Sequence, residues 1–209
     1  MTDILLIALA MSLLYMSIAN RIVTYLQILC FQGIVLFFTT FLTLTEVNTV
    51  NVLFIMLETL VFKAIAVPLF MNHIIKRNKI TRETEPYLPN FLSLIIVTII
   101  IVIAIILSNL VQDANLDKTF FVVALSTIFT GLYLIVSRKK IITHIVGYLV
   151  IENGVFVLSL AVGNEMPMLM NLGIMLDIFA SVLILGVFFQ KIGDVLKDPD
   201  VDLLSNLKD

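Results

Sequence analysis

The sequence predicts an all-α fold, a polytopic membrane helix bundle of about seven transmembrane helices. Of its 209 residues, 60% are hydrophobic and only 13% are charged, and the mean hydropathy is +1.11. Soluble domains carry about 25% charged residues, and a soluble fold of this length could not bury so much apolar surface, whereas lipid accepts it. The apolar stretches lack the alternation of barrel strands, so helices are the expected state.

Seven segments are long and apolar enough, or nearly so, to cross the hydrocarbon core, which needs about 20 residues. They are residues 3–20, 22–44, 51–75, 89–111, 118–137, 141–163 and 168–189. The N-terminus has no basic stretch and no cleavage site, so we expect the first segment to be a retained helix. We divide the chain into a three-helix unit at 1–88, a linking helix at 89–117, a second three-helix unit at 118–190 and a cytoplasmic tail at 191–209.

The Lys and Arg residues alternate between the connections. Eleven lie in the first, third and fifth connections and in the tail, one (Lys118) lies in the others, and Lys63 lies inside a helix. Basic residues mark the cytoplasmic side of a membrane protein. The sequence therefore predicts a multi-pass protein of the inner (cytoplasmic) membrane, with its N-terminus outside and its C-terminus in the cytoplasm.

Two pairs of short segments suggest an internal repeat. Residues 55–58 (IMLE) are similar to 174–177 (IMLD), and Gln32-Gly33 is similar to Asn153-Gly154. Helices 1–3 and 5–7 would then form parallel repeats, as some transporters do. The alternative is chance similarity between two halves that are both rich in Ile, Leu and Met.

Four ionisable residues lie well inside the predicted spans: Glu58, Lys63, Glu152 and Asp177. A charge at a helix centre costs about 2.5–3.5 kcal/mol on insertion scales. Glu152 and Asp177 lie near mid-membrane, where burial favours the neutral form of a carboxyl group and allows it to exchange protons near neutral pH. The pattern predicts a proton or ion path. The plainer alternative is that the acids are protonated or paired and only hold helices together.

Other polar residues support these charges. Tyr148 and Ser181 lie one turn from Glu152 and Asp177 and can donate hydrogen bonds to them.

Two histidines, His73 and His144, lie near the predicted cytoplasmic ends of their helices. They would either gate protons or play a structural role. We expect interhelical contacts rather than transport for three further side chains, Gln27, Gln32 and Asn153.

The helix that carries Lys63 has two further features. In an α-helix Glu58 and Lys63 would lie about 140° apart, so each needs a partner on another helix or in another subunit. Pro68 removes a backbone donor and frees the carbonyl of Ala64, which allows a kink beside the charge.

No motif for catalysis or cofactor binding accompanies these charges. The sequence has no CxxC, P-loop, GxGxxG or metal-ligand cluster, and the single Cys30 can neither form an internal disulfide nor hold a metal. We expect no catalytic residue, no cofactor in this chain and no nucleic-acid partner; membrane lipid surrounds it.

The segment 120–190 resembles the K subunit of respiratory complex I and the C subunit of Mrp-type cation/proton antiporters. Those proteins have three helices, a basic first connection and one acid in each of the next two helices. The matching residues here are Arg138-Lys139-Lys140, Glu152 in LVIENG and Asp177 in LGIMLD. In layout, the whole chain is similar to hydrogenase-4 component E of formate hydrogenlyase-type nickel–iron hydrogenases. It departs from the complex I pattern in having Asp177 where those subunits have Glu, and in a shorter connection between the two helices.

The resemblance implies a non-catalytic subunit of an oxidoreductase complex, with a proton (or sodium) path through Glu152 and Asp177 that Glu58 and Lys63 extend. It places the nickel–iron centre and iron–sulfur clusters in partners: antiporter-like membrane subunits, a membrane subunit like the complex I H subunit, and peripheral hydrogenase and iron–sulfur subunits. Two alternatives stay open, a subunit of an Mrp-type antiporter without redox partners and a non-conducting structural anchor.

Overall fold

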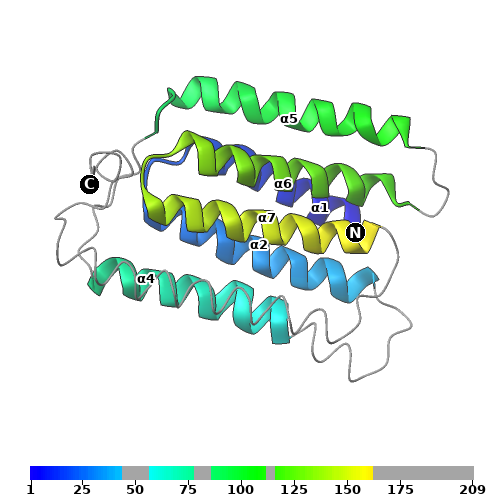
Figure 1. The fold of residues 1–209 in the computed structure, drawn as a ribbon. Helices are drawn as coiled ribbons and strands as arrows, with labels where there is room; N and C mark the ends of the chain where they lie inside the picture. The colour runs from blue at the N-terminus through cyan, green and yellow to red at the C-terminus, as the bar shows by residue number, and fades with distance from the viewer. Residues whose placement is uncertain (44–56, 78–85, 112–115, 162–209) are drawn as a thin grey trace, which may run out of the picture.

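The computed structural model describes residues 1–43, 57–77, 86–111 and 116–161, and every named element in these ranges is a helix (Figure 1). The elements are α1 (Thr2–Ile18), α2 (Ile22–Thr43), η1 (Leu57–Ala66), α4 (Val67–Arg77), α5 (Asn90–Leu110), α6 (Lys118–Ser137) and α7 (Ile141–Ala161). η1 is a π-helix that runs directly into α4. The prediction of a helical fold is confirmed for the described residues.

Four of these helices are long and apolar enough to cross a membrane, namely α2, α5, α6 and α7. α1 is apolar but shorter, with 17 residues. The protein is therefore a membrane protein. The segment expected at 168–189 lies outside the described residues, so the number of seven helices, the orientation in the membrane, the internal repeat and the division into units remain predictions.

The helices lie nearly side by side, with α6, α1, α7 and α2 in the middle of the bundle (Figure 1). α5 packs against α1 and α6 on one side, and the η1–α4 helix packs against α2 on the other. In α7, 67% of the membrane-length window is buried, against 22% in α5. α7 is thus a central helix, whereas most of α5 is exposed at the edge of the bundle.

Glycines bring α6 and α7 into close contact. A Cβ atom added to Gly131 of α6 would lie 2.7 Å from the carbonyl oxygen of Gly147, and one added to Gly154 of α7 would lie 2.8 Å from the backbone nitrogen of Ile128. Small residues let helix backbones approach closely in a membrane, where packing rather than hydrophobic burial holds helices together. The α6–α7 pair is therefore a tightly packed hairpin that fixes the position of α7.

One end of the bundle gathers three connections. The buried Arg138 donates from Nη2 to the carbonyl oxygen of Ser17 at 2.6 Å, which ties the end of α6 to the end of α1. The backbone nitrogen of Tyr87 donates to the carbonyl oxygen of Ser137 at 3.0 Å, which brings the start of α5 to the same place. Arg21 and the basic run 138–140 thus share one end of the bundle, as the alternating charge pattern requires.

Candidate functional site

An ion pair joins the two halves of the chain inside the bundle. Lys63 Nζ on η1 lies 2.7 Å from Glu152 Oε1 on α7. Both residues are 8% exposed. Glu152 lies eleven residues after Ile141 and nine before Ala161, which is the middle of α7. The expectation that Lys63 has its partner on another helix is confirmed, and that partner is Glu152.

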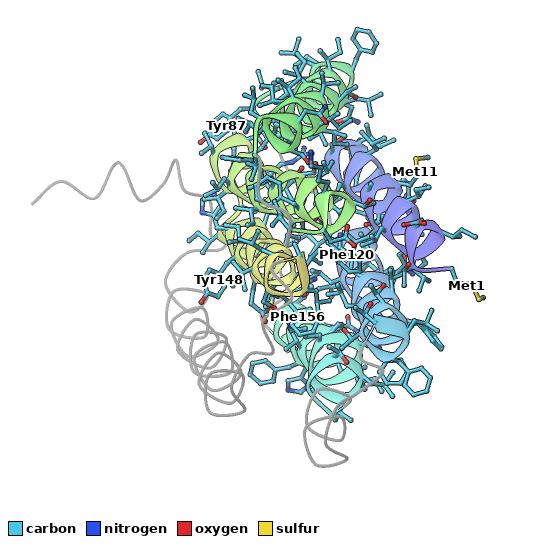
Figure 2. All side chains as sticks on the ribbon, turned by 90° about the vertical axis from the view of Figure 1, so that its right-hand side faces the viewer. Met1, Met11, Tyr87, Phe120, Tyr148 and Phe156 are labelled. Atoms are coloured by element: carbon cyan, nitrogen blue, oxygen red, sulfur yellow. The ribbon has the colours of Figure 1, made fainter. Side chains whose placement is uncertain are left out.

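An aromatic ring also contacts the ammonium group. Lys63 Nζ lies 4.5 Å from the centroid of the Phe156 ring, and Phe156 follows Glu152 by one turn on α7. Figure 2 shows Phe156 on the side of α7 that faces the η1–α4 helix. A cation over an aromatic face is stabilised by the ring, more strongly where water is excluded. The ammonium group therefore contacts both a carboxylate and an apolar ring.

The backbone around Lys63 is irregular. η1 is π-helical over ten residues and changes to α-helix at Val67, next to Pro68, which has no N–H group to donate. The π-helix beside the charge was not predicted, and the kink expected at Pro68 stays a prediction. The predicted angle of about 140° between positions 58 and 63 assumed an α-helix. Because η1 is a π-helix, whose hydrogen bonds join residues five apart, that angle is wrong.

A buried hydrogen-bond chain crosses from α7 to α1 next to the ion pair. Asn153 Nδ2 donates to Gln32 Oε1 at 3.1 Å, and Gln32 Nε2 donates to Ser12 Oγ at 2.9 Å. Ser12 Oγ donates in turn to the carbonyl oxygen of Leu9 at 2.6 Å. The predicted interhelical contact of Gln32 and Asn153 is confirmed, whereas Gln27 is exposed.

The pair brings an acidic and a basic side chain together at a buried position. Lys63 Nζ and Glu152 Oε1 are 2.7 Å apart, but the angles of the contact do not make it a hydrogen bond, so the two groups interact through their charges. In low-dielectric surroundings two charges attract strongly but have also lost their hydration, and a buried lysine changes its protonation state more readily than an arginine. Lysine and carboxylate side chains can both exchange protons in proteins, and here one of each meets at a buried position.

The sequence of the chain has distant similarity to known proteins. The chain is 29% identical to hydrogenase-4 component E of Escherichia coli K12 over 153 residues, which is 70% of this chain and 68% of that protein, and the Shigella flexneri protein of the same name matches equally. It is 24% identical over 130 residues to an uncharacterized protein of Mycobacterium tuberculosis, and the match spans 59% of that protein and 61% of this chain. The chain is thus distantly similar to a hydrogenase component. No family model and no solved structure matches it.

The other predicted site residues lie in different places. Tyr148 is 37% exposed and lies on the side of α7 away from α2 (Figure 2). His144 Nε2 lies 2.9 Å from the carbonyl oxygen of Arg138, in the connection before α7. His73 is exposed on α4. The functional roles given to these three residues remain predictions.

Three predicted residues lie beyond what the structure describes. Asp177 and Ser181 belong to residues 162–209, and the side chain of Glu58, on η1, is also outside the described part. Among the described residues, no three His, Cys, Asp or Glu side chains gather as metal ligands. The expectation that the redox centres lie in partner subunits therefore stays a prediction.

Two features of the site were not evident from the sequence. Phe156 was one apolar residue among many, although its spacing of four from Glu152 places both on one face of α7. The pairing of Glu152 with Lys63 depends on how α7 and η1 are rotated toward each other, for which the sequence carries no local signal.

Proposed function

We propose that the chain is a membrane subunit of a hydrogenase-4/complex I-like assembly and carries part of its proton (or sodium) path. The observation that carries the proposal is the Lys63–Glu152 pair, buried at the middle of α7. A charged residue inside a membrane span is costly to insert, and such residues usually serve transport or signalling. Redox chemistry in partner subunits would drive protonation changes at the pair.

The pair is a poor device for holding helices together. Replacing a buried ion pair by apolar residues of similar volume is often neutral or stabilising, and the surrounding bundle already has close glycine contacts between its helices. A structural anchor would therefore gain little from these two charges. Proton exchange between a lysine and a carboxylate, in contrast to a structural role, requires both groups.

The path would cross between the two predicted three-helix units. Lys63 belongs to the unit at 1–88 and Glu152 to the unit at 118–190, so the pair joins them. The path would run through Glu152 and Asp177, and Glu58 and Lys63 would extend it. A change in the relative position of the units would alter the contact and thereby the protonation of the pair.

The similarity to hydrogenase-4 component E supports placing the chain in such an assembly. Antiporter-like subunits and a subunit like the complex I H subunit would be its membrane neighbours, and peripheral hydrogenase and iron–sulfur subunits would carry the nickel–iron centre and the clusters. The location would be the inner membrane. Purification of the native complex through a tag on this chain, followed by identification of its subunits, tests the assembly. Recovery of antiporter subunits without any redox subunit would contradict it.

The transport role is tested by Glu152→Gln and Asp177→Asn in inverted membrane vesicles that contain the assembled complex. We expect donor-driven proton uptake to fall at least about tenfold in each variant, since a proton-transfer group typically contributes 10²–10⁴-fold. Val155→Ala, three residues from Glu152 and 39% exposed, serves as the control and should leave uptake unchanged. Normal proton uptake and electron transfer in Glu152→Gln, with normal assembly, would refute the role and leave a structural anchor.

A further inference from the structure

Two consecutive residues of α2, Gln32 and Gly33, contact the sequence neighbours of the ion pair. Gln32 contacts the residue after Glu152, and Gly33 contacts the residue after Lys63. Gln32 accepts a hydrogen bond from Asn153, which follows Glu152. Gly33 faces Ala64, which follows Lys63, and a Cβ atom added to Gly33 would lie 2.8 Å from both the Cα and the backbone nitrogen of Ala64. α2 therefore contacts both helices of the pair at the level of the pair itself.

From this juxtaposition we infer that Gln32 and Gly33 are positioning residues, which set the distance and direction of Lys63 and Glu152 toward each other. The inference rests on the proposed function, because it gives the pair its working geometry. Gln32 controls the rotation of α7, and Gly33 controls how near η1 can approach α2.

The rotation of α7 follows from helix geometry. Consecutive residues of an α-helix are about 100° apart around its axis, so an Asn153 side chain held toward α2 also fixes the direction in which Glu152 projects. Gln32 is fully buried, and its own direction is set by the bond from Nε2 to Ser12 Oγ at 2.9 Å. The oxygen and the nitrogen of the Gln32 amide each take part in a hydrogen bond. The hydrogen bonds therefore run in one direction, from Asn153 to Gln32 and from Gln32 to Ser12.

The approach of η1 follows from the missing side chain at position 33. Contacts of 2.8 Å between a Cβ and backbone atoms do not occur in folded proteins, so an alanine at position 33 would push η1 away from α2. A buried glycine is the residue that permits this approach. Since Lys63 is fixed to the same backbone as Ala64, the displacement would pass directly to the ion pair.

The experiment measures the energetic coupling of the pair by double-mutant cycles in the purified full-length chain, reconstituted in lipid nanodiscs. Lys63→Met, Glu152→Gln and the double variant are melted by circular dichroism, and the coupling is the part of the melting-temperature change that is not additive. The cycle is repeated with Gln32→Leu and with Gly33→Ala. We expect each background to lose at least half of the wild-type coupling. A loss of stability that is equal in all variants of one cycle cancels in the calculation. The cycle therefore reports only a change in the interaction between Lys63 and Glu152.

Three further variants serve as controls for the cycle. Gln27→Leu, an exposed glutamine on the same helix, should leave the coupling unchanged. The double exchange Gln32→Asn with Asn153→Gln keeps the total length of the amide bridge and should restore the coupling. Ser12→Ala removes the acceptor for Gln32 and the hydrogen bond from Ser12 to the carbonyl oxygen of Leu9. It is a milder change should Gln32→Leu fail to fold, and it should weaken the coupling in part.

Unchanged coupling in Gly33→Ala and in Gln32→Leu or Ser12→Ala would overturn the inference and leave these residues as ordinary packing. This outcome is separate from failure of the proposed function, which is judged by proton uptake in Glu152→Gln. If uptake survives in Glu152→Gln while the coupling still depends on Gln32 and Gly33, positioning of the pair stands and its transport role does not.

Discussion

Lys63 Nζ and Glu152 Oε1 lie 2.7 Å apart, although 89 positions separate the two residues in the sequence. The contact connects a π-helix of the first half of the chain to the central helix of the second half. Phe156 lies on the same face of α7 as Glu152 and covers the ammonium group at 4.5 Å. A cation, an anion and an apolar ring thus meet at a buried position.

Removal of one member of the pair should cost much more stability than removal of both. Glu152→Leu leaves a buried lysine without its carboxylate, which typically costs about 3–5 kcal/mol, whereas apolar replacement of a whole buried pair is often neutral or stabilising. We therefore expect Lys63→Met with Glu152→Leu to melt close to the wild-type chain and well above Glu152→Leu alone. Thermal unfolding by circular dichroism checks this, and equal melting temperatures of the single and double variants would contradict it.

The glycine contact between α6 and α7 should not tolerate a methyl group. In Gly131→Ala the new Cβ would lie 2.7 Å from the carbonyl oxygen of Gly147, so the helices must separate. Overpacking of this kind typically costs about 1–3 kcal/mol. The adjacent Leu132 is 45% exposed, and Leu132→Ala is the matched control with a small expected effect. A Gly131→Ala chain that unfolds at the wild-type temperature would show that α6 and α7 are not so close.

The start of α6 depends on an N-cap. The Asp117 side chain accepts hydrogen bonds from the backbone nitrogens of Thr119 at 3.0 Å and Phe120 at 3.3 Å. Loss of such a cap typically costs about 1 kcal/mol, and asparagine caps as well as aspartate. Asp117→Ala should therefore lower the melting temperature, and Asp117→Asn should not. Equal loss in both variants would mean that the charge, rather than the cap, stabilises this end of α6.

The predicted orientation can be checked with single cysteines in a Cys30→Ser background. Lys118→Cys should react with a membrane-impermeant maleimide in intact spheroplasts, because Lys118 is exposed at the start of α6 on the predicted outer side. Lys139→Cys, at the other end of α6, should react only after the membrane is permeabilised. The reverse pattern of labelling would invert the topology inferred from the basic residues.

Helix positions within the described residues could be predicted closely from the sequence. The spans expected at 118–137 and 141–163 correspond to Lys118–Ser137 and Ile141–Ala161. The length of an apolar stretch and the charges that bound it are local properties, and a bilayer of given thickness selects for them. The depth of Glu152 follows from the same local information, because it depends only on distance along α7.

The partners of the buried polar residues could not be predicted in the same way. Every long helix here is apolar on nearly all sides, so its composition does not indicate which face turns toward which neighbour. The contacts of Lys63 with Glu152 and of Gln32 with Asn153 depend on helix rotation and spacing, which arise from glycine contacts and hydrogen bonds between distant segments. The number and depth of buried charges are thus properties of the chain, whereas their pairing is a property of the packed bundle, because lipid drives helices into the membrane but does not choose their neighbours.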